Sequence, residues 1–385
     1  MAKLKKEQKK RPVIPTEVKT KLWLKSCGRC EFEGCNIPLW TDNLTYREMN
    51  ISYIAHIYGY AEGSARYDAI KSPLLEKEFE NLMLLCDVHH RMIDDKKNEE
   101  EYNSLRLIQM KKHHEETMIF LTGLTSNKRS HIVLFGAKIG LHDSPLQFNR
   151  AALAMKPNYY PATPSPIELG LKNSSFEDSK DNYWDIQLEN LEVLFSQRLG
   201  NLKANHDVQH FSIFALAPQP LLIKFGTLLS DIYEAEIYQL HREPYTWGWV
   251  DDDTTIHHKL LEFEKYGNNI VLKFELSATI INTRITAVLG EDCSIWSITH
   301  DNPLNNDYIR NRDNIADFRK TMRKAFDTIK AKHGQNVVLH IFPAMPVSIA
   351  VELGRVWMPK ADLPMVIYDQ NNKLDGFYKT ITINH

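Results

Sequence analysis

Hydrophobic and polar residues follow a helical period near both ends of the first 122 residues. The stretch "TEVKTKLWLKS" (16–26) predicts a helix with Thr16 as its capping residue. The stretch "EEEYNSLRLIQMKKHHEETMIFL" (99–121) predicts a second helix, whose apolar positions include Leu105, Ile108, Ile119 and Leu121. Between them, "MNISYIAHIYGY" (49–60) alternates loosely and is rich in Ile and Tyr, which favours a strand.

The rest of the chain has a different pattern, in which short apolar runs of strand length alternate with helical segments. The clearest helix is "IADFRKTMRKAFDTIKAKHG" (315–334), which is amphipathic and closed by Gly334. Alternating strands and helices predict α/β layers with a largely parallel sheet. The predicted strands lie in "HIVLFGAKIGL", "QHFSIFALA", "NNIVLKFELSATI", "EDCSIWSITH", "NVVLHIFPA" and "LPMVIYD".

A change of composition separates the two parts. The stretch "TGLTSNKRSH" (122–131) has no periodicity and is typical of a linker. We therefore predict one domain over 1–122 with a basic tail over 1–15, a linker over 123–130, and a second domain over 131–385. Within the second domain, residues 211–229 resemble residues 338–357: each has an apolar strand, a Pro and an apolar helix that contains Gly. A true repeat implies two similar lobes that face each other, and chance similarity is the alternative.

Composition excludes several classes of protein. The net charge of −2 is not that of a polycation, although residues 1–25 hold nine Lys and Arg against Glu7 and Glu17. This basic start is interpreted as a solvated tail, with a phosphate-binding arm as the alternative. Neither a secretory signal nor a long uninterrupted apolar run is visible, so we expect a cytoplasmic protein without membrane contact. Four of the five cysteines precede residue 90, which indicates metal binding rather than disulfides.

The metal ligands are expected in two separated stretches, "CGRCEFEGC" and "NLMLLCDVHHRMIDD". Cys30 and Cys35 lie on a Gly-containing knuckle, and Cys86 and His89 lie at the start of a predicted helix. Two pairs of soft ligands far apart in sequence are typical of a closed, structural zinc site. Cys27 with Cys30 is a rival pairing.

The neighbouring histidine, His90, points elsewhere, because adjacent helical residues are about 100° apart. Asp94 shares its helical face, and a His and an Asp at that spacing can hold a harder, catalytic divalent ion. With His56 in "YIAHIYG" and Asn81 in "ENLMLLC", this set resembles the HNH endonuclease ββα-metal motif over roughly residues 20–115.

The resemblance implies a role for each residue of the motif. His56 is the general base that takes a proton from water, His90 helps to bind a Mg²⁺-like ion, and Asn81 holds the loop that carries His56. Arg66 in "GSARYD" is a candidate contact to a substrate phosphate, with a surface ion pair as the alternative. One departure is Ala55, which stands where many HNH enzymes have a metal-binding Asp or His. The ion must then be held by His90, by Asp94 or Asp95, and by water and substrate oxygens.

The second domain resembles the SAVED sensor domain, which is fused to effectors in bacterial CBASS anti-phage systems. The motifs that carry the resemblance are "HIVLFGAKIG", "HREPYTWGWVDD", "FELSATI" and "LHIFPAMPVSIAVELGRVWMP". The whole chain is thus similar to the HNH–SAVED effector endonucleases. The implied fold is an α+β, zinc-stabilised HNH domain followed by a larger α/β SAVED domain of two similar Rossmann-like lobes.

That family implies antiviral defence by a metal-dependent endonuclease that degrades double-stranded DNA once a cyclic dinucleotide binds SAVED and promotes homo-oligomerisation. In open α/β sheets, ligands bind beyond the carboxyl ends of the strands, where helix N-termini attract phosphates. Pro220 and Pro346 mark two such termini. The candidate ligand-binding residues are Arg242, Tyr245, Trp247, Ser277, Thr299, Ala344, Pro346 and Ser348; core packing is the alternative for Trp247.

Two other functions are open. One is a restriction-type HNH endonuclease with a DNA-recognition C-terminal domain, against which residues 126–385 carry 27 Lys and Arg but 30 Asp and Glu. The other is a non-catalytic zinc protein, against which the full set of His56, Asn81 and His90 argues.

Overall fold

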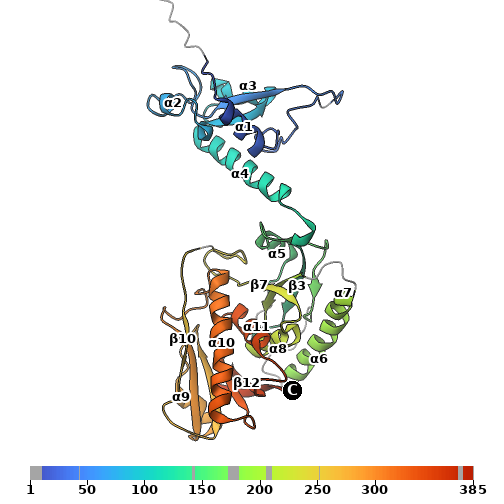
Figure 1. The fold of residues 1–385 in the computed structure, drawn as a ribbon, viewed down its shortest axis with the longest axis vertical. Coiled ribbons are helices and arrows are strands. Elements are labelled where there is room, and N and C mark those ends of the chain that lie inside the picture. Colours follow the sequence, from blue (N-terminus) through green and yellow to red (C-terminus); the bar gives the residue numbers. More distant parts are fainter. Residues whose placement is uncertain are drawn as a thin grey trace, which may run out of the picture. The chain divides into compact units, whose positions relative to one another are not determined.

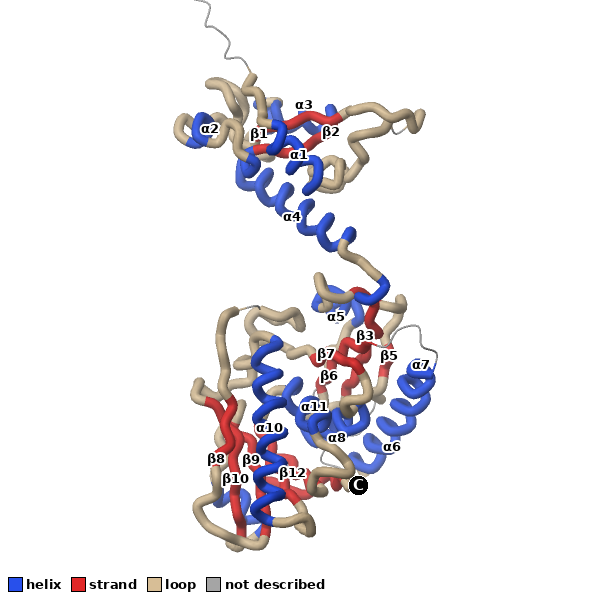
Figure 2. Tube along the Cα trace, in the orientation of Figure 1, coloured by secondary structure: helices blue, strands red, loops and turns tan. Residues whose placement is uncertain are grey.

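The structure is a computed structural model that describes residues 11–42, 44–140, 144–171, 182–204, 210–250, 252–371 and 376–384. Residues 1–10 of the predicted basic tail lie outside the described residues. The chain divides into two compact units, Met1–Leu124 and Thr125–His385 (Figures 1 and 2). No helix in the described ranges combines the length and the apolar character needed to cross a membrane.

The first unit is built around a two-stranded antiparallel sheet that leads directly into a helix. Strand β1 pairs with β2 so that His56, the last residue of β1, lies opposite Leu82, the first residue of β2. All five residues of β2 are buried, as its sequence LMLLC requires. The elements of this unit are α1 (Thr16–Lys25), β1 (Ser52–His56), α2 (Lys71–Leu74), η1 (Phe79–Asn81), β2 (Leu82–Cys86), α3 (Asp87–Asp94), η2 (Lys96–Asn98) and α4 (Ser104–Thr122).

Both predicted helices of this unit form, with two corrections. Thr16 is the first helical residue and its side chain makes no capping hydrogen bond, because Pro15 occupies the cap position of α1. In α4, the predicted apolar positions are exposed, since Lys111 and His114 belong to the buried face instead. Lys111 forms an ion pair with Glu115, its ammonium 2.9 Å from the carboxylate, and His114 hydrogen-bonds the backbone carbonyl of Ser26, so the buried charge and the buried ring each have a partner.

The second unit contains two mainly parallel sheets, as the alternation of strands and helices predicts. One sheet has the order β13-β12-β11-β9-β10-β8 and the other β4-β3-β6-β7, with β5 also paired to β3. Among the strands that the structure describes in this unit, only the edge strands β8 and β13 are antiparallel to their neighbours. The strands are β3 (Arg129–Gly136), β4 (Tyr160–Pro161), β5 (Ile167–Glu168), β6 (His210–Leu216), β7 (Glu234–Ile237), β8 (His258–Leu261), β9 (Asn269–Glu275), β10 (Cys293–His300), β11 (Leu339–Ala344), β12 (Met365–Asn371) and β13 (Gly376–Ile383).

Helices cover these sheets, and the α/β prediction for this part of the chain is confirmed. Strand β3 begins at Arg129, two residues inside the predicted linker. The helices are η3 (Ser126–Lys128), α5 (Phe148–Ala154), α6 (Tyr183–Phe195), the π-helix η4 (Ser196–Gly200), α7 (Asn201–Ala204), α8 (Gln219–Leu229), α9 (Asn282–Leu289), α10 (Arg312–His333) and α11 (Val347–Val356).

The two similar stretches of sequence form equivalent strand–helix units, β6–α8 and β11–α11. Their helices pack against each other and cross at Gly226 and Gly354 (Figure 1). A Cβ atom on Gly226 would lie 2.9 Å from the Cα of Gly354 and 2.0 Å from the carbonyl oxygen of Val351. Only residues without a side chain allow this approach. One continuous hydrophobic core, which includes both helices, therefore joins the two lobes.

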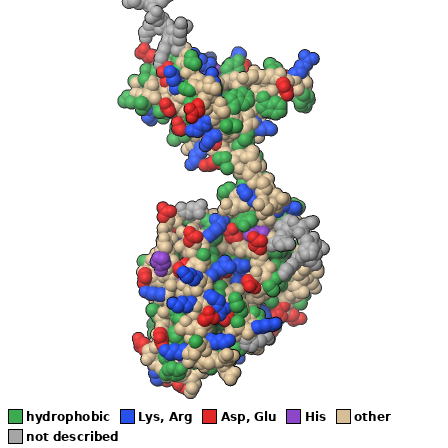
Figure 3. Space-filling view, in the orientation of Figure 1, with side chains coloured by type: hydrophobic (Ala, Val, Ile, Leu, Met, Phe, Trp, Pro, Cys, Tyr) green, Lys and Arg blue, Asp and Glu red, His purple; other side chains and the backbone are tan. Residues whose placement is uncertain are grey.

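Basic side chains gather on one face of the second unit, over and beside α10 (Figure 3). Several of them are paired with acids. Arg319 lies 3.4 Å from Glu352, and Arg323 contacts both Asp327, at 2.9 Å, and Asp362, at 2.7 Å. These pairs offset much of the positive charge, in agreement with the slight acidic excess of residues 126–385.

Candidate functional site

Three cysteines and one histidine converge in the first unit. The ligand atoms of Cys30, Cys35, Cys86 and His89 all lie within 4.8 Å of one another. The knuckle between α1 and β1 supplies the first two, the end of β2 supplies Cys86, and the first turn of α3 supplies His89. The Nδ1 atom of His89 faces the cluster, 3.2 Å from the Sγ atom of Cys86 and 3.7 Å from that of Cys30.

The chemistry of this cluster fits a zinc ion. Burial raises the pKa of the Cys30 thiol, and likewise that of Cys35, so both favour the protonated form unless a cation is bound nearby. The ring of Phe32 stacks on His89 with centroids 4.1 Å apart and fixes its orientation. Three sulfur atoms and one imidazole nitrogen suit a closed tetrahedral site. Cys27 is exposed and does not belong to the cluster, so the rival pairing lacks support.

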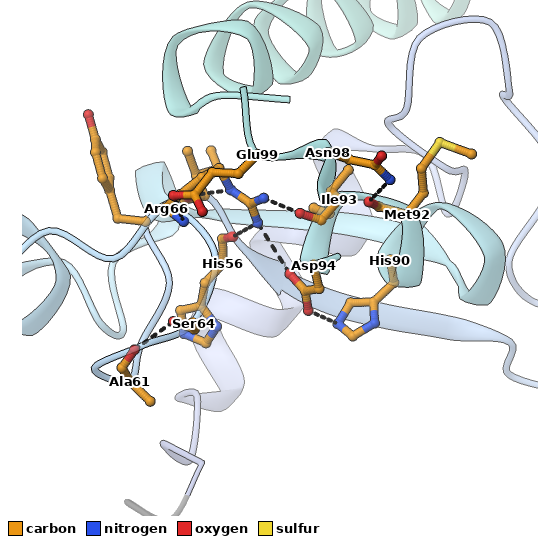
Figure 4. Close-up of polar contacts among 12 residues, drawn as sticks. His56, Ala61, Ser64, Arg66, His90, Met92, Ile93, Asp94, Asn98 and Glu99 are labelled. Atoms are coloured by element: carbon orange, nitrogen blue, oxygen red, sulfur yellow. Dashed lines mark hydrogen bonds and ion pairs between the residues drawn. The ribbon is translucent and has the colours of Figure 1, made fainter. Parts of the chain in front are cut away.

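His90 does not join this cluster but lines a separate pocket with His56. The pocket has a volume of about 370 Å³. Strand β1, helix α3, helix η2 and the loop that follows β1 form its walls. Figure 4 shows His56, His90 and Asp94 in this region. The lining residues are Arg11, His56, Gly59, Tyr60, Gly63, Ser64, Ala65, His90, Asp94 and Lys96.

The geometry of His56 assigns its two ring nitrogens. Its Nε2 atom lies 3.0 Å from the backbone carbonyl oxygen of Glu76. A carbonyl only accepts hydrogen bonds, so Nε2 carries the proton and Nδ1 keeps the lone pair. Burial lowers the pKa of His56, which keeps the ring neutral near pH 7. A neutral imidazole with a free Nδ1 lone pair can accept a proton.

Asn81 holds the chain just beyond His56. Its side-chain Oδ1 accepts a hydrogen bond of 2.7 Å from the backbone N–H of Tyr58, and its Nδ2 donates one of 3.2 Å to the carbonyl of the same residue. Its own carbonyl accepts from the N–H of Ile57 at 2.8 Å. Asn81 is almost completely buried, so these bonds are shielded from water. The contacts agree with the role that the sequence predicts for Asn81.

His90 and Asp94 can supply two ligands to one divalent cation. The Nε2 atom of His90 lies 3.4 Å from the Oδ2 atom of Asp94, and Tyr53 stacks on the His90 ring. Ala55 is buried in the hydrophobic core of this unit and offers no ligand. The side chain of Asp95 instead caps η2 by accepting from the N–H of Lys97. Water and substrate oxygens would complete the coordination of such an ion.

Arg66 does not face the pocket, and its predicted contact with substrate phosphate is wrong. Its side chain is only 2% exposed. The guanidinium donates to the carbonyls of Ile57, at 2.9 Å, His56, at 3.3 Å, and Ile93, and it pairs with Oδ1 of Asp94 at 3.2 Å (Figure 4). The alternative of a surface ion pair is also wrong, because Arg66 joins β1 to the end of α3 inside the unit.

The predicted ligand residues of the second unit fall into separate groups. Three of them meet where parallel strands end: Thr299 donates its hydroxyl to the carbonyl of Glu275 at 3.1 Å, and the N–H of Ser277 donates to the carbonyl of Ala344 at 2.9 Å. Pro346 caps α11 immediately after this point. This edge is the position that the strand-end rule predicts for a ligand.

Arg242 and Tyr245 lie on a different segment, after β7. The backbone N–H of Arg242 donates a hydrogen bond of 3.0 Å to the carboxylate of Asp307, and Arg242 is exposed. Tyr245 is 50% exposed and lies under the guanidinium of Arg150. Within the described ranges, neither residue hydrogen-bonds to the strand-end group of Thr299, Ser277 and Ala344.

Two predicted ligand contacts are wrong because the side chains are buried. Trp247 packs edge-on against Phe214 in a hydrophobic cluster, so the core-packing alternative is correct. Ser348 is fully buried, and its hydroxyl donates to the side-chain oxygen of Gln239 at 2.7 Å.

Two glutamines that were not among the predicted site residues bridge the lobes. Gln239 accepts from both the N–H and the hydroxyl of Ser348, and Gln219 accepts from the N–H of Met345 at 3.3 Å. Both side chains come from the β6–α8–β7 lobe and bind backbone or hydroxyl groups at the start of α11. A signal for Gln219 was present in the sequence, since it lies between Pro218 and Pro220 at a predicted helix start.

Comparisons with known proteins identify the second unit. Residues 191–383 match the family described as "SMODS-associated and fused to various effectors sensor domain", or SAVED. The match covers half of the chain, and the chain belongs to the SAVED family. The prediction of a SAVED domain is therefore confirmed over residues 191–383. No curated protein matches the sequence.

Solved structures resemble the chain only distantly. A Cap4 SAVED/CARF-domain containing receptor of Acinetobacter baumannii with the cyclic trinucleotide 2′3′3′-cAAA is 14% identical, with a TM-score of 0.44 over 83% of this chain and 67% of that one. The same receptor with the cyclic trinucleotide 3′3′3′-cAAA is 14% identical, with a TM-score of 0.43 over 83% of this chain and 68% of that one. A Cap4 SAVED/CARF-domain containing receptor of Moraxella osloensis is 13% identical, with a TM-score of 0.38 over 83% of this chain and 66% of that one.

Proposed function

We propose that the chain is a CBASS effector in which the SAVED unit binds a cyclic oligonucleotide and thereby switches on DNA cleavage by the first unit. The observation that carries the nuclease part is the pocket that His56 and His90 share, next to a separate Cys₃His cluster. The sensor part rests on membership of the SAVED family. In the proposal, ligand binding also promotes self-association.

The pocket supports phosphodiester hydrolysis through its proton chemistry. His56 has a lone pair on Nδ1 and a hydrogen bond to a carbonyl on Nε2, so it can take a proton from a water molecule at the edge of the pocket. The carbonyl of Glu76 then stabilises the positively charged ring. Asn81 keeps the following residues in place, so that the base does not move away during the reaction.

A divalent ion such as Mg²⁺, held by His90 and Asp94, would supply positive charge where the phosphate oxygens become more negative. Arg66 holds one oxygen of Asp94, which leaves the other directed to His90. The Cys₃His cluster would hold zinc and stabilise the unit, since it has no open ligand position.

The proposal is tested by incubating supercoiled plasmid with the full chain and Mg²⁺, with and without a panel of cyclic dinucleotides and trinucleotides. We expect cleavage only with particular cyclic oligonucleotides. His56→Ala should abolish cleavage, and His113→Ala, at an exposed position of α4, should not. Sedimentation of the same samples measures self-association.

Each other result rejects a defined part of the proposal. Cleavage that is independent of every cyclic oligonucleotide would favour a restriction-type endonuclease. Full activity of the His56→Ala variant would remove His56 as the base. No cleavage under any condition, with ligand binding intact, would favour a non-catalytic zinc protein.

A further inference from the structure

The pocket of the first unit contains two cations whose function the HNH resemblance does not explain. Arg66 is withdrawn into the interior and satisfied by carbonyls and Asp94. Arg11 and Lys96, in contrast, both line the pocket with His56 and His90. Asp94 is the one acid among the lining residues, and Arg66 already pairs with it. The pocket is therefore a positively charged hollow before any metal binds.

Arg11 is fixed close to both histidines. Its Nη2 atom donates a hydrogen bond of 2.6 Å to the carbonyl of Ile54, in the middle of β1. Arg11 lines the same pocket as His56 and His90. The N–H groups of its guanidinium that do not bind Ile54 can donate hydrogen bonds to phosphate oxygens in this pocket.

Lys96 lines the same pocket but comes from a later part of the chain, just after α3. It lies in η2, a turn that is held by the Asp95 cap on Lys97 and by a 3.0 Å hydrogen bond from Asn98 to the carbonyl of Met92. Within the described part of the chain, the Lys96 ammonium has neither a hydrogen-bond acceptor nor a carboxylate partner. An exposed, unpaired ammonium on a fixed turn is suited to a phosphate as a point charge.

We propose that Arg11 and Lys96 bind the backbone phosphates of the nucleic acid on either side of the bond that is cleaved. The inference rests on the proposed function and names the residues that grip its substrate. These two side chains would make the phosphate contact that was predicted for Arg66. Phosphate contacts of this kind supply affinity and register without reading the base sequence.

The test measures the salt dependence of duplex binding. The parent is the full chain with His56→Ala, mixed with a panel of cyclic dinucleotides and trinucleotides and a fluorescent 30-base-pair duplex, and binding is followed by anisotropy. Each phosphate contact adds about 0.9 to the slope of log affinity against log salt. Arg11→Gln and Lys96→Gln should each lower the size of that slope by about one. Between about 50 and 200 mM KCl, the affinity of each variant for the duplex should then fall by a factor roughly three times smaller than that of the parent.

Controls separate substrate binding from structural effects. Lys97→Gln removes the same charge from the neighbouring residue, which does not line the pocket, and should leave the slope unchanged. Arg11→Lys keeps the charge and should restore most of the slope. Hydrolysis of bis(p-nitrophenyl) phosphate, which has a single phosphate and no flanking ones, should fall much less than plasmid cleavage in the Gln variants made without His56→Ala.

Three results would overturn the inference. The first is an equal salt slope in Arg11→Gln, Lys96→Gln and Lys97→Gln, while the wild-type chain still cleaves plasmid; the proposed function would then stand alone. The second is a loss of activity on both substrates together with a lower thermal midpoint, which would make Arg11 and Lys96 structural. The third is no duplex binding and no cleavage by the wild-type chain, which would remove the proposed function as well.

Discussion

Replacing Arg66 by Met should destabilise the first unit far more than any exposed charge substitution. Met fills a similar space but donates no hydrogen bond. The change leaves three backbone carbonyls, those of His56, Ile57 and Ile93, without their donor, and it removes the partner of Asp94. Removing one partner from a buried ionic group costs about 3–5 kcal/mol. Because Asp94 is half exposed and can be rehydrated, we expect the lower end of that range.

Differential scanning calorimetry of the full chain measures this effect. For a unit of this size, a loss of about 3 kcal/mol lowers the thermal midpoint by roughly 12 °C or more. The transition of the second unit serves as an internal reference and should not move. Arg91→Met is the matched control: Arg91 is 75% exposed and pairs with Asp87 one turn earlier on α3, so its loss should leave the midpoint nearly unchanged. Equal midpoints for Arg66→Met and Arg91→Met would refute the assignment of Arg66 as the internal tie between β1 and α3.

Three further predictions concern metal, packing and pH. Cys86→Ser should lower zinc content, measured by atomic absorption, and thermal stability together, whereas Cys27→Ser should change neither; normal zinc in the first variant would reject the ligand set. Gly354→Ala should lower the midpoint of the second unit by forcing α8 and α11 apart, at a cost of about 1–3 kcal/mol, and an unchanged midpoint would show that the helices separate freely. Burial lowers the pKa of His258 to about 4, so the folded state binds this proton less readily than the unfolded chain. Stability against urea should therefore fall as the pH drops from about 6.5 to about 4, and a flat profile over that range would contradict the prediction.

Local periodicity was enough to predict much of the first unit. Adjacent residues of a helix point in different directions, and the structure has His89 in the Cys₃His cluster and His90 in the pocket with His56. The strand within residues 49–60 and the helix within residues 99–121 follow from the pattern of apolar residues, whereas β2 was not predicted. Arg66 could not be placed in this way, because its left-handed backbone, with φ of 56°, turns its side chain inward. That turn depends on contacts with His56, ten residues earlier, and with Asp94, 28 residues later, and no helical or strand period links residues at these separations.

In the second unit, the sequence predicts the order of strands and helices well but the ligand-binding residues poorly. The run of short apolar stretches separated by helices predicts parallel sheets without knowledge of their order. Trp247 and Ser348 are candidate ligand contacts in the sequence but are buried in the structure, because neither residue type reveals its burial in sequence. The bond from Ser348 to Gln239 joins residues 109 positions apart, which no local pattern can indicate.

All the side chains proposed for cleavage come from one unit and are already held there by that unit's own hydrogen bonds. Because the pocket is already assembled, binding of a signal molecule to the second unit does not need to rearrange the side chains around the reacting atoms. Under the proposed function, the cyclic oligonucleotide must then control whether duplex DNA can enter the pocket or stay bound there. The chain without this ligand should therefore still hydrolyse a small phosphodiester that has no flanking phosphates.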